Sequence, residues 1–318
     1  MKLVFLDMKT LGFEVDASGL YRFGEVCLYD NVLDEDVPAA ISDADIVITN
    51  QNQLDERNLG SAGKLKLICA AATGYNNIDT VYCGKHHIAV TNVPGYAAGS
   101  VAQHTFAMLF YLVSRSRYYD DFVKSGEYSK GGLTIHSGKD FMELEGKRWG
   151  IIGLGEIGKK VASHAECFGC DVIYYSASGK TRSDRYRQAA LEELLRTSDI
   201  ISIHAPLNSF TKGLIGMEQL RQMKKTAYLL NLGRGGIIKE NDLAEAIENG
   251  LIAGAGLDVF ETEPLPAESP LLRLRGRDNI IMTPHIGYGS VEARDRLMQT
   301  VCKNIEAFLS GERYNRVD

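Results

Sequence analysis

Short apolar runs alternate with longer amphipathic stretches along most of the chain. This alternation is typical of parallel sheets whose strands are joined by crossover helices, and it is unlike the patterns of sandwiches or bundles. In the first hundred residues, four apolar runs separated by polar segments predict strands that begin at Lys2, Ala44, Leu65 and Ile88. This part of the chain is therefore predicted to form a small, doubly wound α/β unit.

A second and stronger series of apolar runs begins at Arg148. Its members are RWGIIG, DVIYYS, DIISIHAP, AYLLNLG, AGAGLDV and NIIMTPH, and a helical or loop segment separates each from the next. This is the pattern of a six-strand Rossmann sheet. The fold class predicted for the chain is thus α/β, with two doubly wound parallel sheets.

Two further stretches have the length of helices. Residues 100–124 form the first, and Ser100 is placed to act as its N-cap. Residues 290–310 form the second, which is amphipathic, and Gly311 is well placed to end it.

Composition and charge narrow the classes of partner. With 318 residues, of which 45% are hydrophobic and 24% charged, the chain is long enough for two globular domains. Its net charge is -6 and its basic residues are scattered, so we expect neither a nucleic acid nor a membrane surface as partner. The first apolar run is interrupted by Asp7, which is unlike a signal peptide, and no later run approaches the length of a membrane span.

The cysteines have no framework spacing, so we expect reduced thiols and a cytoplasmic protein. They are Cys27, Cys69, Cys83, Cys167, Cys170 and Cys302. Cys167 and Cys170 form a C-x-x-C pair that could be redox-active or half of a metal site. However, no second pair follows, and Gly169 marks this position as a junction between a helix and a strand. We expect no metal site.

A glycine motif predicts a dinucleotide site. Residues 153–158, Gly-Leu-Gly-Glu-Ile-Gly, match G-x-G-x-x-G directly after an apolar strand and directly before an amphipathic helix. Gly153 permits the tight turn, Gly155 lets the backbone approach the pyrophosphate, and Gly158 lets the helix pack on the strand. Glu156 and Ile157 open the helix, whose free N–H groups would face the phosphates. The alternative is a glycine-rich turn without a ligand, but the strands and the helix around it favour cofactor binding.

The residue after the next strand bears on the choice of cofactor. A site selective for NAD normally carries Asp or Glu there to bind the ribose hydroxyls, whereas this chain has Ser176. Ser178, Lys180 and Arg182 could contact a 2'-phosphate, so NADPH is favoured over NADH. The alternative is that Lys180 and Arg182 are ordinary solvated charges and that NAD is held through other contacts.

Three segments in the second half carry candidate catalytic residues. They are NLGRGGIIKENDL around Arg234, GLDVFETEP around Glu263 and TPHIG around His285. Together with the glycine motif, HAPLNSFTKGLI from His204, TNVPGY and ATGYNNID, they resemble the D-isomer-specific 2-hydroxyacid dehydrogenase family. The resemblance covers essentially the whole chain in the family's order.

This resemblance implies a domain arrangement and an activity. A Rossmann cofactor domain at residues 98–287 would be inserted into a flavodoxin-like substrate domain made of residues 1–97 and 288–318. The chain would be an oxidoreductase that transfers a hydride between NAD(P)H and a small 2-oxo or 2-hydroxy acid of D configuration. By the same analogy it would form a homodimer, with the segment after residue 115 reaching across to the partner.

The chemistry of the reaction explains the three residue types. His285 would act as general acid or base, since its ordinary pKa of about 6.5 lies near the working pH. Glu263 would favour the protonated ring and orient it, and Arg234 would pair with the substrate carboxylate and polarise the carbonyl. Taken individually, His285 could be a core or capping histidine, Glu263 a charge in a loop and Arg234 a charge on the surface. Their shared position just beyond predicted strands, at the edge where ligands bind, favours catalysis.

The resemblance also implies secondary contacts. Backbone N–H groups at Thr73 and Gly74 would cradle the substrate carboxylate, and Asp258 would bind the nicotinamide carboxamide. The positions expected to line the cofactor cleft are Pro206, Thr211 and Leu232. His204 is interpreted as a structural residue, and His104 receives no role.

Within the family, the chain most resembles glycerate dehydrogenases and hydroxypyruvate or glyoxylate reductases. The loop at residues 50–54 would face the substrate side chain, and its polar character favours small polar acids. A short phosphoglycerate dehydrogenase is an alternative, although the sequence shows no regulatory domain. A formate dehydrogenase is disfavoured, because the formate-specific members pair the catalytic His with Gln, whereas this chain has Glu263. A dinucleotide-sensing, corepressor-like binding protein is the alternative from another class.

Overall fold

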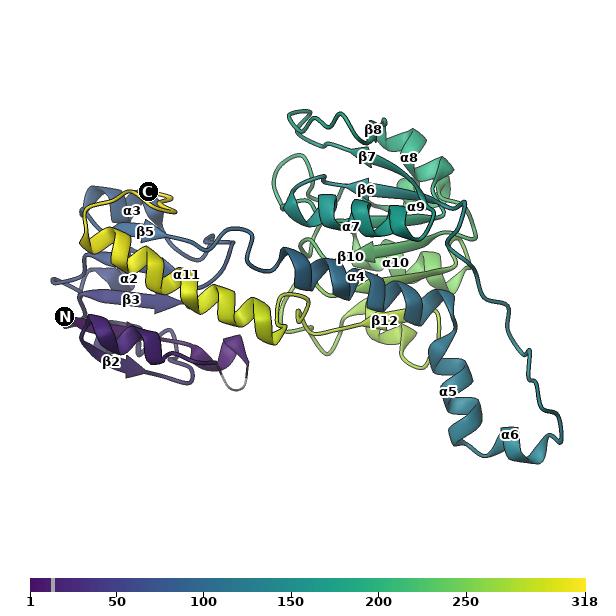
Figure 1. Ribbon diagram of the computed structural model, residues 1–318, viewed down its shortest axis with the longest axis horizontal. Coiled ribbons are helices and arrows are strands. Elements are labelled where there is room, and N and C mark those ends of the chain that lie inside the picture. Colours follow the sequence, from purple (N-terminus) through teal and green to yellow (C-terminus); the bar gives the residue numbers. More distant parts are fainter. Residues whose placement is uncertain (13–14) are drawn as a thin grey trace. The chain divides into compact units, whose positions relative to one another are not determined.

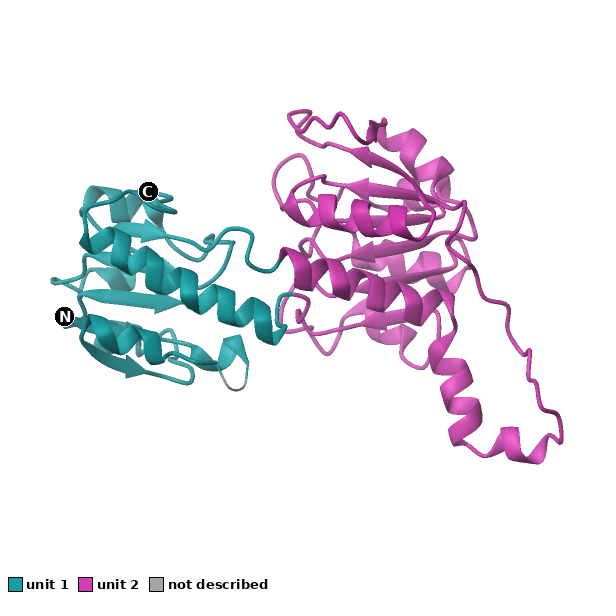
Figure 2. Cartoon of the chain, in the orientation of Figure 1, with its two compact units in different colours: residues 1–97, 288–318 teal, residues 98–287 magenta. Residues whose placement is uncertain are grey.

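The computed structural model describes residues 1–12 and 15–318. The chain divides into two compact units, shown in different colours in Figure 2. The first unit consists of residues 1–97 and 288–318, and the second of residues 98–287. No helix among the described residues combines the length and the apolar character that crossing a membrane requires.

The described residues of the first unit form a five-stranded sheet in the order β2-β1-β3-β4-β5, with every pair parallel. The strands are β1 (Lys2–Phe5), β2 (Glu25–Leu28), β3 (Ile46–Thr49), β4 (Leu67–Ala70) and β5 (Ala89–Thr91). All residues of β3 and β4 are buried, as continuous apolar strands covered on both faces should be. This order is the flavodoxin-like one, in which the strand order reverses between β1 and β3.

Helices complete the first unit. They are the 3-10 helices η1 (Met8–Leu11) and η2 (Ser18–Phe23), together with α1 (Val37–Ile41), α2 (Glu56–Leu59), α3 (Thr80–Lys85) and α11 (Val291–Leu309). The long helix α11 packs against β4 and η2, and Figure 1 shows it in yellow across the strands. Ser290 caps it by accepting a hydrogen bond from the N–H of Ala293 at 3.2 Å. It ends before Gly311, which has a positive φ of 81°. The predicted bounds of this helix are confirmed.

The second unit contains a seven-stranded parallel sheet in the order β12-β11-β10-β9-β6-β7-β8. The strands are β6 (Arg148–Ile152), β7 (Asp171–Tyr175), β8 (Arg187–Gln188), β9 (Ile200–Ile203), β10 (Tyr228–Asn231), β11 (Gly254–Leu257) and β12 (Ile280–Met282). The strand order reverses between β6 and β9, and ligands of doubly wound sheets bind at the carboxyl ends of the strands beside such a point. The predicted fold class is confirmed.

Helices lie on both faces of this sheet. They are α4 (Ala98–Val113), α5 (Ser116–Lys124), α6 (Glu127–Lys130), α7 (Glu156–Cys167), α8 (Leu191–Thr197), α9 (Met217–Gln222), α10 (Glu240–Glu248) and the 3-10 helix η3 (Pro270–Leu274). Helix α4 packs against α7 and contacts β10, β11 and β12 (Figure 1). Because right-handed crossovers change face when the strand order reverses, α8 covers the face opposite to α7.

Four predictions about elements were wrong. The six-strand Rossmann sheet has a seventh strand, β8, and the first sheet has an unpredicted strand, β2. Both are edge strands without a fully buried residue, so they lack the apolar pattern that marks the others. Residues 100–124 form two helices rather than one, because Arg115 adopts a left-handed conformation with φ of 54°. Ser100, predicted as the N-cap, lies inside α4, two residues after its first residue, and its hydroxyl donates to the carbonyl of Gly287 at 2.6 Å.

Candidate active site

The glycine motif lies at the carboxyl end of β6, next to the point where the strand order reverses. Gly153 has φ of 94°, and a Cβ there would lie 2.8 Å from the backbone of Ala205. A Cβ at Gly158 would collide with the carbonyl of Gly153, so strand and helix meet closely. At Gly155 a Cβ would meet nothing within 4 Å, which leaves open space at the N-terminus of α7. Glu156 and Ile157 form the first turn of α7, whose N–H groups lack partners within the helix. The motif fits a dinucleotide pyrophosphate.

Ser176 directly follows β7 and is buried at 7% exposure. Its hydroxyl accepts a hydrogen bond from the N–H of Thr181 at 3.3 Å, which closes a tight turn. This turn presents Ser178 and Lys180 to solvent. Arg182 is also exposed, and its guanidinium donates to the side chain of Gln188 at 2.9 Å. No carboxylate occupies this strand end.

The loop after β9 is held by Thr211. This residue is 1% exposed, and its hydroxyl donates to the carbonyl of Pro206 at 2.6 Å and accepts from the N–H of Asn208 at 2.9 Å. Leu232 directly follows β10 and is also buried. Pro206 and Thr211 thus follow β9, which pairs with β6, and Leu232 follows β10, which is the next strand beyond β9.

The candidate catalytic residues come from loops after β10, β11 and β12. Nδ1 of His285 lies 2.7 Å from Oε2 of Glu263, while Oε1 of Glu263 accepts the N–H of Phe260 at 2.9 Å. A Cβ at Gly235 would collide with the carbonyl of Phe260, so the loops that carry Arg234 and Glu263 pack directly together. The structure therefore brings all three residues to one edge of the sheet.

Charge stabilises the carboxylate of Glu263. Burial raises the pKa of Glu263. Together, the hydrogen bond and charge of His285, the N–H of Phe260 and the charge of Arg234 outweigh this effect, so the net pKa lies below its usual range. Glu263 is therefore ionised at neutral pH and accepts a proton held on Nδ1 of His285. The side chains of His285 and Glu263 are 37% and 36% exposed, which leaves the pair accessible.

Arg234 is exposed at the end of β10, beside Glu263. Its Nη1 donates to the carbonyl of Gly233 at 2.8 Å, and the side chain of Asn231 donates to the carbonyl of Arg234 at 2.9 Å. These bonds fix the backbone and one guanidinium nitrogen. The remaining donors of the guanidinium are suited to a carboxylate.

Asp258 is only 3% exposed and has many partners in the protein. Its Oδ1 accepts from the hydroxyl of Thr283 at 2.6 Å and from the N–H of Ile286 at 2.9 Å, and its Oδ2 accepts from the N–H of Gly287 at 2.8 Å. Burial raises the pKa of Asp258, but hydrogen bonds from His104, Thr283, Ile286 and Gly287 outweigh it and lower the net value. No residue pattern in the sequence indicated these bonds to the residues around His285.

His204 occupies a closed site beneath this edge. Nε2 of its ring lies 3.0 Å from the hydroxyl of Ser202, and complete burial lowers its pKa to about 3. Ser202 also accepts from the indole N–H of Trp149 at 2.9 Å. His204 is therefore neutral at ordinary pH and sits within the core, as a structural residue would.

Thr73 and Gly74 belong to the first unit, in the loop after β4. The hydroxyl of Thr73 donates to the carbonyl of Val93 at 2.9 Å, and its own carbonyl accepts from the side chain of Asn92 at 2.8 Å. These bonds hold the loop in place.

The carboxylate of Asp7, to which the sequence pattern assigned no role in the site, orders the polar loop of the first unit. Asp7, 1% exposed at the end of β1, accepts the N–H groups of Asn50, Gln51 and Asn52 at 2.6 to 3.1 Å. The signal was an Asp placed directly after a buried strand.

The cysteines take no part in this site. All six are free thiols, and α7 ends at Cys167 before Gly169, which has φ of 76°. Burial raises the pKa of Cys170 to about 11, so this thiol is unreactive at neutral pH. Within residues 1–12 and 15–318, no cluster of three or more His, Cys, Asp or Glu side chains is placed to hold a metal ion.

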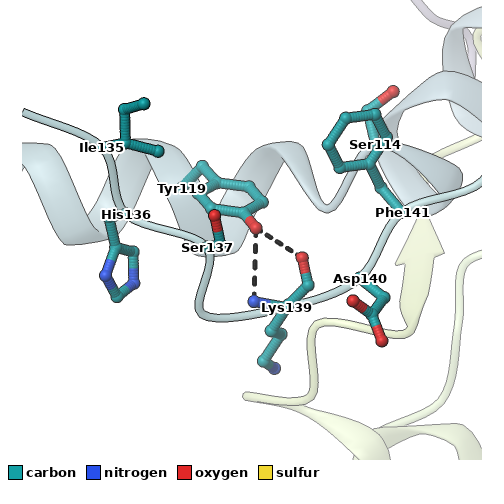
Figure 3. Close-up of a pocket in the computed structure, with 8 residues that line it drawn as sticks. All are labelled: Ser114, Tyr119, Ile135, His136, Ser137, Lys139, Asp140 and Phe141. Carbon is teal, nitrogen blue, oxygen red and sulfur yellow. Dashed lines mark hydrogen bonds between the residues drawn. The ribbon is translucent and has the colours of Figure 1, made fainter.

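A separate pocket lies away from these residues, in the segment that follows α4 (Figure 3). Its lining residues are Ser114, Tyr119, Ile135, His136, Ser137, Lys139, Asp140 and Phe141. The hydroxyl of Tyr119 accepts from the N–H of Lys139 at 3.2 Å and donates to the carbonyl of the same residue (Figure 3). None of the predicted site residues lines this pocket.

Comparison with known proteins identifies the family of the chain. Residues 106–287 match the model of the D-isomer specific 2-hydroxyacid dehydrogenase NAD binding domain. A hydroxypyruvate reductase from Blautia hydrogenotrophica is 36% identical over the full length of both chains. A glyoxylate reductase from Thermococcus litoralis is 41% identical over 82% of this chain and 79% of that protein. A D-lactate dehydrogenase structure from Aquifex aeolicus, complexed with NAD and lactic acid, is 30% identical with a TM-score of 0.83, and the match covers 98% of this chain and 96% of that one.

The chain therefore belongs to the D-isomer specific 2-hydroxyacid dehydrogenase family. It is an oxidoreductase that transfers a hydride between a nicotinamide cofactor and a 2-oxo or 2-hydroxy acid. The predicted family, enzyme class and type of reaction are confirmed.

Proposed function

We propose that this enzyme reduces glyoxylate or hydroxypyruvate to the corresponding 2-hydroxy acid, of D configuration where the product is chiral, with NADPH as the preferred cofactor. The observation that carries the reaction is the pair formed by His285 and Glu263 beside Arg234, at the carboxyl edge of the sheet that bears the glycine motif. The bound nicotinamide would supply the hydride to the carbonyl carbon of the acid.

The residues of the chain would supply the proton and the orientation. Because ionised Glu263 holds Nδ1 of His285, the other ring nitrogen is the one that would give its proton to the carbonyl oxygen. Arg234 would pair with the substrate carboxylate and polarise the carbonyl. In the reverse reaction His285 would take the proton from the hydroxyl. We assign the cofactor domain to residues 98–287 and the substrate domain to residues 1–97 and 288–318.

The substrate class rests on the first unit and on the relatives. N–H groups at Thr73 and Gly74 would receive the carboxylate of the acid. The loop at residues 50–54, which Asp7 orders, offers amide side chains rather than an apolar patch. A small acid with a polar or absent side chain suits such a loop better than an aromatic one. The relatives named for hydroxypyruvate and glyoxylate reduction support this choice.

The cofactor preference rests on the turn after β7. Ser176 leaves this strand end without the carboxylate that would repel a 2'-phosphate, while Ser178, Lys180 and Arg182 are exposed next to it. Pro206, Thr211 and Leu232 would line the cofactor cleft. Asp258 would reach the nicotinamide carboxamide only through the lone pairs left open by its hydrogen bonds from Thr283, Ile286 and Gly287.

We also propose that the enzyme is a cytoplasmic homodimer. Residues 131–147 contain no helix or strand, and Leu133, Ile135 and Phe141 in this segment are 73%, 76% and 67% exposed. Exposed apolar side chains gathered on one segment are typical of protein interfaces. The partner subunit would cover these side chains, and the six free thiols suit a reducing compartment.

The test follows the nicotinamide absorbance while purified enzyme is offered NADPH or NADH with glyoxylate, hydroxypyruvate, pyruvate and phenylpyruvate in turn. Fast oxidation of NADPH with glyoxylate or hydroxypyruvate is expected. Oxidation of NADH with a bulkier acid would overturn the choice of substrate and cofactor but keep the mechanism. If 3-phosphohydroxypyruvate were the best substrate, the enzyme would be a short phosphoglycerate dehydrogenase. Absence of turnover with every acid would favour a dinucleotide-sensing binding protein.

A further inference from the structure

His104 lies on α4 with its ring directed at the segment around His285. Its Nε2 is 3.0 Å from the hydroxyl oxygen of Thr283 and 3.5 Å from Oδ1 of Asp258. The side chain is 19% exposed, so most of the ring is enclosed.

The direction of these hydrogen bonds follows from counting protons. The hydroxyl of Thr283 has a single proton, and the 2.6 Å bond to Oδ1 shows that it is donated to the carboxylate of Asp258. The hydroxyl oxygen must therefore accept from His104, which places a proton on Nε2 of this histidine. His104, Thr283 and Asp258 thus form one continuous chain of donors and acceptors.

This series of hydrogen bonds holds the backbone on both sides of His285. Thr283 precedes His285 by two residues, and Asp258 accepts the N–H groups of Ile286 and Gly287, which follow it. His285 itself has φ of 54°, a left-handed conformation that residues other than glycine rarely adopt. Such a conformation persists only where the surrounding contacts enforce it.

The packing around Gly287 supports the same arrangement. A Cβ at this position would lie 2.8 Å from Oδ2 of Asp258 and 3.4 Å from Cδ2 of His104. The ring of His104 therefore packs against the segment after His285 while its Nε2 reaches the residue before that histidine.

We propose that His104 is a positioning residue that acts through Thr283 and Asp258 to hold the ring of His285 toward Glu263. This inference rests on the catalytic role proposed above for His285. His104 itself would contact neither substrate nor cofactor in the reaction.

The first test compares two substitutions of His104. His104→Leu removes the donor to Thr283 and is expected to lower kcat about tenfold with little change in the KM for the acid. His104→Gln can place an amide N–H near the position of Nε2 and is expected to restore most of the loss. Thr105→Val is the matched control, because the Thr105 hydroxyl donates to the carbonyl of Val101 in its own helix, at 2.8 Å. Equal kcat in the Leu variant and the wild type would overturn the proposal.

A double-mutant cycle tests the route of the effect. If His104 acts through the Thr283 hydroxyl, Thr283→Val should lower kcat by itself, and His104→Leu should add little in that background. Fully additive losses would show that the two residues act independently, which would refute the proposed route from His104 through Thr283. Melting temperatures of all variants separate this effect from a general loss of stability.

A readout that needs no turnover separates this inference from the proposed function. Ring nitrogen NMR spectra of ¹⁵N-labelled protein, assigned with the His285→Gln variant, report the His285 ring directly. In His104→Leu its signals should move, whereas in His104→Gln they should stay close to those of the wild type. Unchanged His285 signals in the Leu variant would overturn the inference even for a protein that reduces no acid. Moved signals without turnover would uphold it and count against the proposed reaction.

Discussion

Oε2 of Glu263 lies 2.7 Å from Nδ1 of His285, and the second oxygen of the same carboxylate accepts the N–H of Phe260. The carboxylate is therefore anchored to the backbone of its own loop, which fixes the ring it holds. Both side chains remain more than a third exposed at this edge of the sheet. Because Glu263 holds Nδ1, the proposed proton transfer would use Nε2.

Replacing His285 by Gln should abolish this proton transfer and leave the cofactor site intact. We expect kcat to fall by about a hundredfold to ten-thousandfold, since a positioned acid contributes that range. Cofactor affinity, measured by the quenching of protein fluorescence, should change little. The control His86→Gln removes an exposed histidine of the first unit. A rate close to that of the wild type would remove His285 from the mechanism.

Arg234 should contribute to both substrate capture and turnover. Arg234→Ala removes the planar donors that would face the carboxylate and the carbonyl, so we expect a higher KM, a lower kcat, and a loss in kcat/KM of roughly tenfold to a hundredfold. Arg234→Lys keeps the charge without the fork and should recover part of that loss. Steady-state kinetics with glyoxylate check both, and Arg273→Ala, which removes a surface pair with Glu248, is the control. Unaltered kinetics in the Ala variant would contradict the assignment.

Ser176 should control the choice between the two nicotinamide cofactors. Ser176→Asp places a negative charge beside the expected 2'-phosphate, and the ratio of kcat/KM values for NADPH and NADH should shift toward NADH by about tenfold or more. Ser183→Asp introduces the same charge in the same loop, where the Ser183 hydroxyl already accepts N–H groups of Arg185 and Tyr186, and should leave the ratio nearly unchanged. Equal ratios in both variants would mean that the ribose binds elsewhere.

Much of the fold could be predicted because buried parallel strands are continuous apolar runs. β3, β4, β9 and β10 are buried throughout, and each was predicted from its sequence. β2 and β8 were missed because a strand at the edge of a sheet has one open side and needs fewer apolar residues. The break at Arg115 was missed because the helical pattern continues on both sides of it.

Only the site residues that belong to sequence motifs could be predicted. Arg234, Glu263 and His285 each lie in the loop that follows a recognisable strand, so the topology of the sheet brings them to one edge. The partners of Asp258 could not be predicted, since hydrogen bonds to backbone N–H groups leave no residue pattern. His104 and Thr283 come from segments 179 residues apart, and only the folded chain shows that they touch.

The segment at residues 131–147 should determine the oligomeric state. Ile135→Lys combined with Leu133→Lys places two charges where the proposed partner subunit would cover apolar side chains. The variant is expected to sediment near the monomer mass of 35.0 kDa, whereas the wild type should sediment at about twice that value. Val81→Lys alters an equally exposed apolar residue of the first unit and should remain dimeric. A wild-type monomer would rule out the homodimer, and a dimeric double variant would place its interface elsewhere.

His204 should make the stability of the protein depend on pH. Its pKa is 6.5 in the unfolded chain and about 3 in the folded one, because the buried ring resists protonation. Between these values the unfolded state binds more protons. The stabilisation is therefore complete above pH 6.5 and is lost as the pH falls toward 3, at up to about 1.4 kcal/mol per pH unit.

The variant His204→Gln has no group that titrates in this range, so its free energy of unfolding should fall less steeply below pH 6. Urea unfolding at a series of pH values measures both slopes, and a constant offset from the altered core does not affect the comparison. His87→Asn removes an exposed histidine and should keep the slope of the wild type, with Asn tolerating the positive φ of 58° at that position. Parallel curves for the wild type and the Gln variant would show that His204 becomes protonated without cost to the fold. Its ring would then be open to solvent rather than part of the core beneath the catalytic edge.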